Sequence, residues 1–198
     1  MNIRISGGQF KGFKFNNPKS SDLRPTMESV RLAIFSILDS KFAGTTNETV
    51  FLDLYSGTGI MGIEALSRGA DKAIFIEKNR SYCYKIKENL KKLNLLNKAE
   101  IFSGSVFANL SKINNKVTHI FLDPPYIFKD YKKLIYEIEN NNILNNNGII
   151  IIEMRNKSLD TFLEHSHYNR YCRQKGDTKI LFLNNKMEKY ESNLSRYF

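Results

Sequence analysis

Asp123-Pro124-Pro125-Tyr126 is the segment of the sequence whose residue types are best suited to chemistry. Two consecutive prolines restrict the backbone, so the groups beside them keep a rigid geometry. The Asp123 carboxylate and the Pro124 carbonyl offer two acceptors for the N–H groups of an exocyclic base amine, and the Tyr126 ring offers a stacking face for an extruded base. We therefore predict that Asp123, Pro124 and Tyr126 are catalytic. The alternative is a structural turn with a buried aromatic ring.

A glycine-rich segment, Gly57-x-Gly59-x-x-Gly62, follows an apolar stretch that ends near Asp53. The spacing matches a dinucleotide-binding fingerprint, but an acid at the strand end would repel a pyrophosphate. Asp53 suits a ligand with an ammonium group, and S-adenosylmethionine carries an ammonium, a sulfonium and no phosphate. Gly57 and Gly59 would let the backbone approach that ligand closely, because a Cβ would collide with it. The alternative for Asp53 is a helix-capping role.

A second acid, Glu77, ends the next apolar segment of the chain. A carboxylate at that position can accept hydrogen bonds from both hydroxyls of a ribose, as the comparable acid does in dinucleotide-binding folds. The alternative for Glu77 is a surface acid at a strand end. The sequence thus predicts an S-adenosylmethionine site that includes Asp53, Ser56, Gly57, Gly59 and Glu77.

The cysteines and histidines indicate no further chemistry. Cys83 and Cys172 lie far apart and in no C-x-x-C pattern, so we expect no disulfide framework and no cysteine-built zinc site, and a reducing cytoplasm fits. Neither cysteine lies near the Asp123 turn, which disfavours methylation of a pyrimidine carbon by a cysteine nucleophile. His165 and His167 have no evident third ligand, so no metal is expected.

Hydrophobic periodicity predicts the elements that position these residues. Residues 26–40 repeat apolar side chains at helical spacing, with Thr26 as the expected N-cap. Beyond them, short apolar strands alternate with helices, which implies an α/β fold with a mostly parallel sheet and right-handed crossovers. The expected strands are residues 50–54, 72–77, 99–102, 117–122 and 148–153 with a closing hairpin of 168–173 and 179–183; the expected helices are residues 60–68, 80–93 and 131–139; the expected loop includes the asparagine clusters 140–142 and 145–147.

The chain is expected to begin with a basic arm. Residues 11–15 alternate in polarity and predict a short hairpin strand. Arg4, Lys11 and Lys14 stand among glycines and phenylalanines, so we expect the arm to contact phosphate groups; the alternative is a solvated flap. The expected division of the chain is an arm of residues 1–25, a main domain of residues 26–185 and a C-terminal tail of residues 186–198.

The 198-residue chain carries 30 Lys and Arg residues against 20 Asp and Glu, for a formal charge of +10. Part of the excess reflects a general richness in Lys and Asn. The remainder favours a polyanionic partner, either nucleic acid or an anionic membrane surface. No apolar run approaches the roughly 18 residues of a membrane-spanning helix, and the opening residues do not resemble a signal peptide. We expect a cytoplasmic protein.

Together these residues resemble those of class I S-adenosylmethionine-dependent methyltransferases. The closer similarity is to the bacterial 16S rRNA guanine-N2 methyltransferases of the RsmD type, and it extends over about residues 3–183. The similar stretches are Arg4-Ile5-Ser6-Gly7-Gly8 with Lys11-Gly12, Leu23-Arg24-Pro25-Thr26 with Val30, Arg31 and Phe35, Asp53-Leu54-Tyr55-Ser56-Gly57-Thr58-Gly59, Gly62-Ile63-Glu64-Ala65-Leu66-Ser67-Arg68-Gly69-Ala70, and Asp123-Pro124-Pro125-Tyr126.

The resemblance implies a Rossmann-like fold: a seven-stranded, mostly parallel sheet with an antiparallel last strand, helices on both faces and a small N-terminal β-hairpin. It implies S-adenosylmethionine as the cofactor and a guanine of 16S rRNA as the substrate, in the small ribosomal subunit or an assembly intermediate. We expect a monomer that binds no membrane. The residues expected to bind the RNA are Arg4, Lys11, Lys14, Arg24, Arg31 and Arg173; the alternative for Arg24 and Arg31 is a structural ion pair.

The sequence departs from the family pattern at a few positions. Leu32 stands where the family usually has Glu. Ser105 stands where an acid usually contacts the adenine, and a hydroxyl would bond the adenine amine more weakly. The late Arg-x-Tyr-Gly appears at residues 173–176 without its tyrosine. These departures concern adenine affinity and one contact with the target, and they leave the catalytic turn intact.

Other functions are left open by the residues alone. An adenine-N6 methyltransferase acting on DNA or RNA can use the same four-residue turn, and only the flanking stretches separate it from a guanine enzyme. A nicotinamide-dependent oxidoreductase is opposed by the placement of Asp53. A noncatalytic RNA-binding assembly factor is opposed by the intact turn at Asp123.

Overall fold

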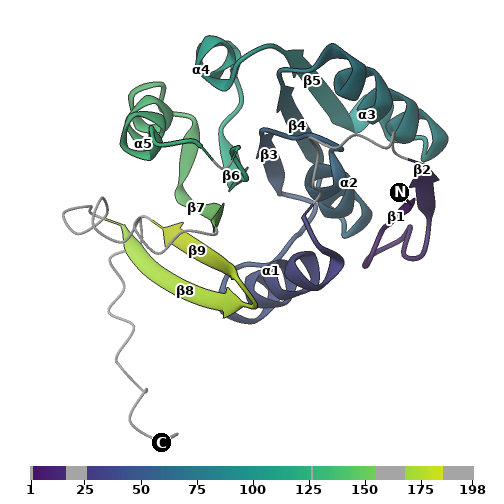
Figure 1. Cartoon of the computed structure of the whole chain (residues 1–198), viewed down its shortest axis with the longest axis horizontal. Coiled ribbons are helices and arrows are strands. Elements are labelled where there is room, and N and C mark those ends of the chain that lie inside the picture. The colour runs from purple at the N-terminus through teal and green to yellow at the C-terminus, as the bar shows by residue number, and fades with distance from the viewer. Residues whose placement is uncertain (1, 17–25, 126, 155–167, 185–198) are drawn as a thin grey trace, which may run out of the picture.

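The computed structural model describes residues 2–16, 26–125, 127–154 and 168–184, and a seven-stranded sheet forms its centre (Figure 1). In spatial order its strands are β5 (Ala99–Ser103), β4 (Lys72–Glu77), β3 (Val50–Leu54), β6 (Val117–Leu122), β7 (Leu144–Met154), β9 (Thr178–Asn184) and β8 (Asn169–Lys175). Strand β9 is antiparallel to both of its neighbours, and every other neighbouring pair is parallel. The expected sheet with an antiparallel last strand is confirmed.

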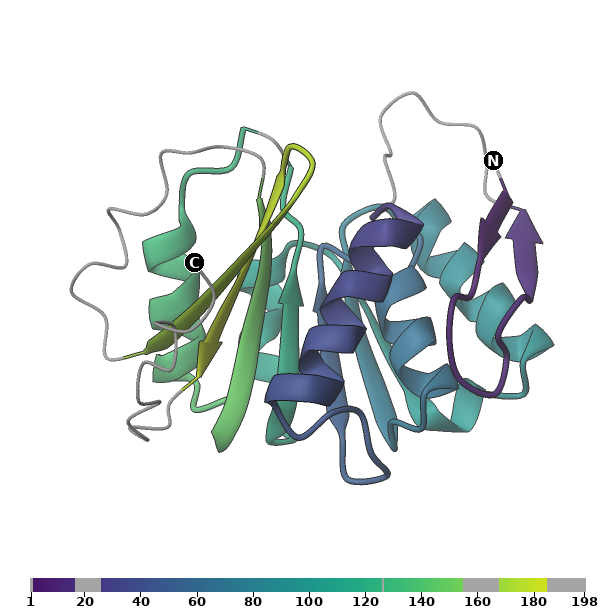
Figure 2. The same cartoon turned by 90° about the horizontal axis from the view of Figure 1, so that it is seen from below.

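Helices cover both faces of the sheet and enclose two hydrophobic cores (Figure 2). They are α1 (Glu28–Lys41), α2 (Ile60–Ser67), α3 (Arg80–Lys92), α4 (Val106–Asn109) and α5 (Tyr131–Asn140), with 3-10 turns η1 (Leu96–Lys98) and η2 (Leu110–Lys112). One core joins α1, α2 and α3 to strand residues such as Phe51, and the other joins α4 and α5 to residues such as Leu52. Successive strand residues point to opposite faces, so each central strand supplies both cores.

The direction of strand addition reverses between β3 and β6. Strand β3 pairs with β4 on one side and with β6 on the other, and the register aligns Leu54 with Ile76 and with Leu122. The glycine loop after β3 and Asp123 after β6 therefore start from neighbouring strand ends. Open α/β sheets bind ligands at the carboxyl ends of their strands at such a switch point.

The expected N-terminal hairpin is present, and it is packed on the main domain. Strands β1 (Asn2–Arg4) and β2 (Lys14–Asn16) pair antiparallel, with Ile3 opposite Phe15. Ile3, Ile5 and Phe15 are buried in the same core as α1, α2 and α3. Residues 17–25 and 186–198, which complete the expected arm and the expected tail, lie outside the described residues. The division into an arm, a domain and a tail stays a prediction.

Some local expectations were wrong. Helix α1 begins at Glu28 after Met27 and has no side-chain cap, so Thr26 is not its N-cap; the Thr26 carbonyl instead accepts a hydrogen bond from Arg31. Asparagines 145–147 are exposed residues of strand β7 rather than a loop. Helix α4 and both 3-10 turns were not expected, because four or fewer residues are too short to show helical periodicity.

Candidate active site

Asp53 joins strand β3 to helix α2. Its carboxylate is buried, and Oδ2 accepts a hydrogen bond of 3.0 Å from the Gly62 N–H in the first turn of the helix. Burial raises the pKa of the Asp53 carboxyl well above its usual range. The Gly62 hydrogen bond opposes that rise, while the charges of Asp123 and Glu77 add to it. The helix-capping alternative therefore describes one role of Asp53. Asp53, Glu77 and Asp123 also share the electrostatic environment of this edge of the sheet.

Glu77 ties the glycine loop to the end of strand β4. Its Oε2 accepts from the Gly57 N–H at 2.7 Å, and its Oε1 accepts from the Asn79 N–H at 2.7 Å. Each carboxylate oxygen can accept more than one hydrogen bond. Glu77 thus orders the loop and keeps the capacity to accept from ribose hydroxyls, which stays a prediction.

The glycine loop is shaped mainly by contacts within the protein. Gly57 and Gly59 have left-handed φ values of 52° and 73°, which glycine adopts without strain. A Cβ on Gly59 would lie 2.7 Å from Ile86 Cγ1 of α3. A side chain at Gly59 would therefore collide with α3. The close approach of a ligand to the backbone of Gly57 and Gly59 stays a prediction. The buried Ser56 hydroxyl donates to the Asp53 carbonyl at 2.6 Å, which orders the loop, and contact between Ser56 and the cofactor stays a prediction.

Three aromatic residues that sequence reasoning missed form a cluster beside the Asp123 turn. The rings of Tyr55 and Phe128 lie 5.5 Å apart, and those of Phe128 and Tyr131 lie 4.9 Å apart, both edge-on. Burial raises the pKa of Tyr131 to about 12, and the charge of Asp123 contributes to the rise. Tyr55 has a positive φ of 61°, which costs energy for a residue with a side chain and is common at functional sites.

The Asp123 turn directly follows strand β6. Asp123 is half-buried, Pro124 is buried and Pro125 is exposed, and the Phe128 N–H donates to the Pro125 carbonyl at 2.8 Å. This hydrogen bond and the aromatic cluster stabilise the loop that follows Asp123. Tyr126 lies outside the described residues, so its stacking role stays a prediction.

Ser105 lies beyond the end of β5, at the same edge of the sheet. It is exposed and is the N-cap of α4, where its hydroxyl accepts from the Ala108 N–H at 3.3 Å. The hydroxyl oxygen keeps one further acceptor position. Contact between Ser105 and an adenine is compatible with this placement and stays a prediction.

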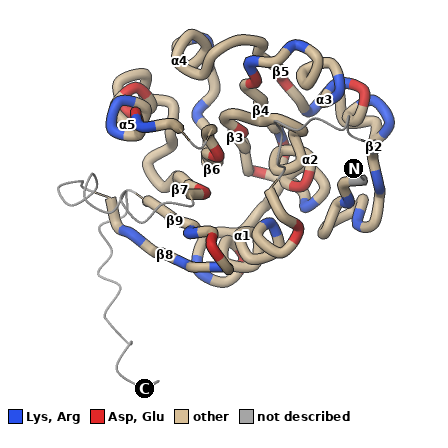
Figure 3. The backbone as a smooth tube through the Cα atoms, viewed as in Figure 1, with Lys and Arg blue, Asp and Glu red and all other residues tan. Residues whose placement is uncertain are grey.

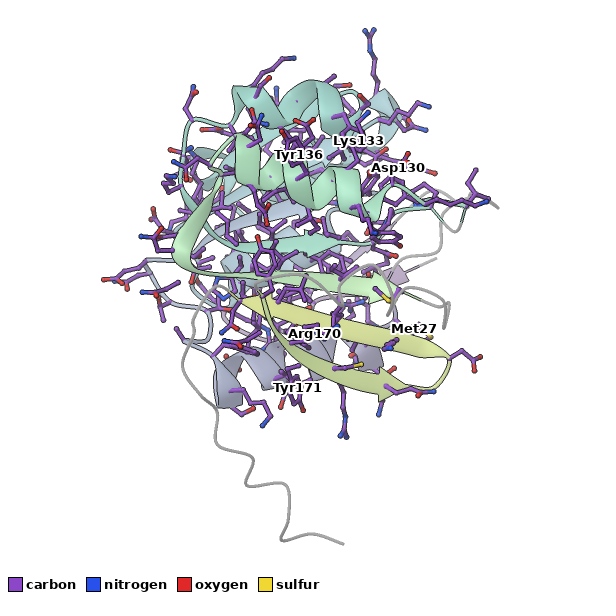
Figure 4. The ribbon with its side chains drawn as sticks, turned by 90° about the vertical axis from the view of Figure 1, so that its left-hand side faces the viewer. Met27, Asp130, Lys133, Tyr136, Arg170 and Tyr171 are labelled. Carbon is purple, nitrogen blue, oxygen red and sulfur yellow. The ribbon has the colours of Figure 1, made fainter. Side chains whose placement is uncertain are left out.

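The exposed basic residues that are expected to bind RNA come from two elements, the N-terminal hairpin and β8. Figure 3 shows Lys and Arg positions in blue along both. Lys11 and Lys14 are exposed on the N-terminal hairpin, and Arg4 is exposed there beside Glu28, 2.7 Å away. Arg173 is exposed on β8, the edge strand of the sheet. Figure 4 shows this strand with Arg170 and Tyr171 labelled on it. Arg24 lies outside the described residues. The RNA contacts themselves stay predictions.

Arg31 is not a surface residue, and the expectation that it contacts RNA was wrong. Its side chain is only 3% exposed, and Nε donates to Glu64 Oε2 at 3.3 Å. Its Nη1 and Nη2 donate to the carbonyls of Thr26 and Arg4, each at 2.7 Å. The structural ion pair is therefore the correct alternative for Arg31. Arg31 lies on the side of α1 that faces α2. The periodicity of α1 alone does not show where α2 packs against it.

The described part of the chain lacks two further features. No cluster of three or more His, Cys, Asp and Glu side chains suited to a metal ion occurs there. No helix in those ranges is both long enough and apolar enough to cross a bilayer.

Comparison with known proteins decides the family. A family model described as Conserved hypothetical protein 95 matches residues 3–184. The chain belongs to this family, the RsmD family. Ribosomal RNA small subunit methyltransferase D of Buchnera aphidicola is 35% identical to this RsmD-family member over 156 residues, which cover 78% of this chain and 79% of the relative. The Escherichia coli K12 protein of the same name is 33% identical over 151 residues, covering 76% and 74%.

Solved structures share the fold of this RsmD-family member. A methyltransferase structure from Escherichia coli has a TM-score of 0.79 at 25% identity, covering 94% of this chain and 100% of that chain. A methylase structure from Haemophilus influenzae has a TM-score of 0.74 at 26% identity, also covering 94% and 100%. The fold is that of a class I methyltransferase.

Proposed function

We propose that this protein transfers a methyl group from S-adenosylmethionine to the exocyclic N2 amine of a guanine in 16S rRNA. The observation that carries the proposal is that the carboxylates of Asp53, Glu77 and Asp123 cluster at the switch point of the sheet. Relatives that share about a third of the sequence are named ribosomal RNA small subunit methyltransferases, which supports ribosomal RNA as the substrate.

The residues at this edge fit S-adenosylmethionine. The raised pKa of Asp53 and the carboxylates that neighbour it favour a ligand that brings positive charge, and this cofactor brings an ammonium and a sulfonium. Asp53 would face the ammonium, Glu77 the ribose hydroxyls and Ser105 the adenine amine. When bound, S-adenosylmethionine supplies an electrophilic methyl group.

The chain's own residues orient the nucleophile. The amine of guanine is a poor nucleophile, because its lone pair is delocalised into the ring. Asp123 accepts one N–H and the Pro124 carbonyl accepts the other, which aligns the nitrogen with the methyl donor. The negative charge of Asp123 stabilises the positive charge that develops on the nitrogen, so its contribution grows toward the transition state. Tyr126 provides the stacking face for the extruded base.

The substrate is the small ribosomal subunit or an assembly intermediate, approached by a monomer in the cytoplasm. The exposed lysines of the N-terminal hairpin and Arg173 of β8 supply contacts to phosphates. Strand β8 runs in the same direction as β7, so Arg173 lies toward the sheet edge that carries Asp123.

Methyl transfer in vitro tests the proposal. Purified protein is incubated with isotope-labelled S-adenosylmethionine and 30S particles from cells that lack this gene, and the rRNA is digested to nucleosides. The proposal predicts labelled N2-methylguanosine. Labelled N6-methyladenosine would instead establish the adenine alternative, and particles that stay unlabelled would overturn the proposal.

A further inference from the structure

Glu64 is a fully buried acid that the proposed chemistry does not use. It lies in α2, two residues after the Gly62 amide that binds Asp53, and its side chain has no exposed surface. A charge in such a place is costly unless it is paired and hydrogen-bonded. The partners of Glu64 therefore indicate why an acid is present.

The donors to Glu64 come from three segments of the chain. Ser6 of the N-terminal hairpin donates twice, through N–H at 3.1 Å and through Oγ at 2.5 Å. Arg31 of α1 donates at 3.3 Å, and Arg68, just after α2, donates through Nη2 at 3.0 Å. Because Arg31 also binds the Arg4 carbonyl, both ends of the segment from Arg4 to Ser6 are tied to this one carboxylate.

The neighbouring turn of α2 extends the same attachment. Ser67 Oγ donates to the Gly7 carbonyl at 2.7 Å and accepts from the Phe10 N–H at 3.0 Å, and the Ser67 carbonyl accepts from the Gln9 N–H at 2.6 Å. A Cβ on Gly7 would lie 2.2 Å from Arg68 Nη2. The hairpin thus satisfies groups at the C-terminal end of α2, which a helix leaves without internal partners.

The lysines expected to meet RNA stand on the part of the chain that this attachment holds. Lys11 and Lys14 are exposed, while Phe15 beside Lys14 is buried in the core shared with α1 and α2. Charges held in fixed positions bind a phosphate backbone in one register, and little conformational entropy is lost in ordering them when RNA binds. A loose hairpin would carry the same charges without that register.

We propose that Glu64 is a positioning residue for the RNA substrate: through Ser6, Arg31 and Arg68 it fixes the basic hairpin on α2, and thereby sets the affinity for rRNA. This inference rests on the proposed function. A merely structural role for Glu64 would lower stability and affect cofactor and RNA binding alike. The positioning role predicts a loss confined to RNA.

The test compares Glu64→Gln with the matched control Asp39→Asn. Asp39 is an exposed acid whose Oδ2 lies 3.9 Å from Arg68 Nη1, and no hydrogen bond joins it to the described residues of the hairpin. For Glu64→Gln we expect faster hydrogen–deuterium exchange in residues 2–16, and a KM for 30S particles raised about tenfold. In Glu64→Gln the slope of log affinity for 30S particles against log salt concentration should become shallower by about 1 to 2. The S-adenosylmethionine affinity should stay within about twofold, and Asp39→Asn should match the wild type throughout.

Ser67→Ala keeps the experiment decisive if Glu64→Gln does not fold. It removes two hydrogen bonds to the hairpin and leaves every charge in place, so we expect the same changes with a KM increase of about threefold. The positioning role would be overturned by a folded variant whose hairpin exchanges faster but whose KM and salt slope equal those of the wild type. It would also be overturned if the hairpin of Glu64→Gln stayed protected from exchange. Wild-type protein that methylates no 30S particle would overturn the proposed function instead.

Discussion

Asp53 and Glu77 each combine a hydrogen bond within the protein with a charge at the sheet edge. Asp53 binds the Gly62 amide and Glu77 binds the Gly57 amide, so alanine at either position removes both a support of the loop and a charge. The neutral amides separate the two effects. Asn or Gln keeps an oxygen that accepts from the backbone N–H and lacks the charge that suits a cationic ligand.

Asp53→Asn is therefore expected to fold as the wild type does and to bind S-adenosylmethionine more weakly by about 1–3 kcal/mol, and Glu77→Gln to show a loss in the same range. Isothermal titration calorimetry measures both affinities, with thermal unfolding as the control for folding. Unchanged affinity in both variants would remove these acids from the cofactor site.

Asp123 is expected to act on turnover. Asp123→Ala should lower the single-turnover rate on 30S particles by about 10²-fold or more, because it removes a group that interacts most strongly with the transition state. Asp123→Asn keeps one acceptor oxygen and should retain more activity than Ala. Cofactor titration should show little change in either. A wild-type rate in Asp123→Ala would place the catalytic turn elsewhere, and a loss confined to cofactor binding would assign Asp123 to the cofactor pocket.

His119 gives a prediction about stability. It is buried in β6 against Phe51, and burial lowers its pKa to about 4. In the unfolded chain a histidine takes up its proton near pH 6.5. The stability that follows from this difference is fully present above pH 6.5 and is lost as the pH falls toward 4, by about 3 kcal/mol in total.

Urea unfolding at pH 7.5 and at pH 5 checks this expectation. The free energy of unfolding of the wild type should fall between the two values by about 2 kcal/mol more than that of His119→Gln, which cannot titrate. Equal falls in the two proteins would show that His119 is not a titrating group of the acid transition.

At the scale of elements, the N-terminal hairpin should supply RNA affinity and leave cofactor affinity unchanged. Replacing Lys11 and Lys14 by Ala should reduce the slope of log affinity for 30S particles against log salt by about 1 to 2, because two phosphate contacts are lost. Lys112 and Lys116 are exposed next to the start of β6, away from the sheet edge that carries Asp123, and their replacement is the matched control. If the hairpin variant has the wild-type slope, the hairpin is a solvated flap that does not contact phosphates.

Elements were predictable where one periodic pattern determines them. Strands 72–77 and 117–122 have the expected bounds, because their apolar runs are buried on both faces and end in polar residues. Short elements such as α4 were not predictable, since four residues show no helical period. The glycine loop was located correctly, but the contact between Gly59 and Ile86 was not predictable, because Ile86 approaches it from a helix distant in sequence.

At the scale of the whole molecule, contacts between distant segments were beyond the sequence pattern. Arg31 and Glu64 lie 33 residues apart, and nothing in the period of α1 identifies an acid in α2 as its partner. The lone acid within the apolar stretch of α2 was the available signal. The clustering of Asp53, Glu77 and Asp123 could be predicted, because carboxyl ends of parallel strands meet at one edge.

Nucleoside mass spectrometry of 16S rRNA from cells with and without this gene tests the central claim most directly. The account predicts that the N2-methylguanosine content of 16S rRNA falls when the gene is removed, because the proposed target is a guanine of that RNA. A gene encoding the wild-type chain should restore it, and one encoding Asp123→Ala should not. An N2-methylguanosine level that is the same with and without the gene would contradict the account.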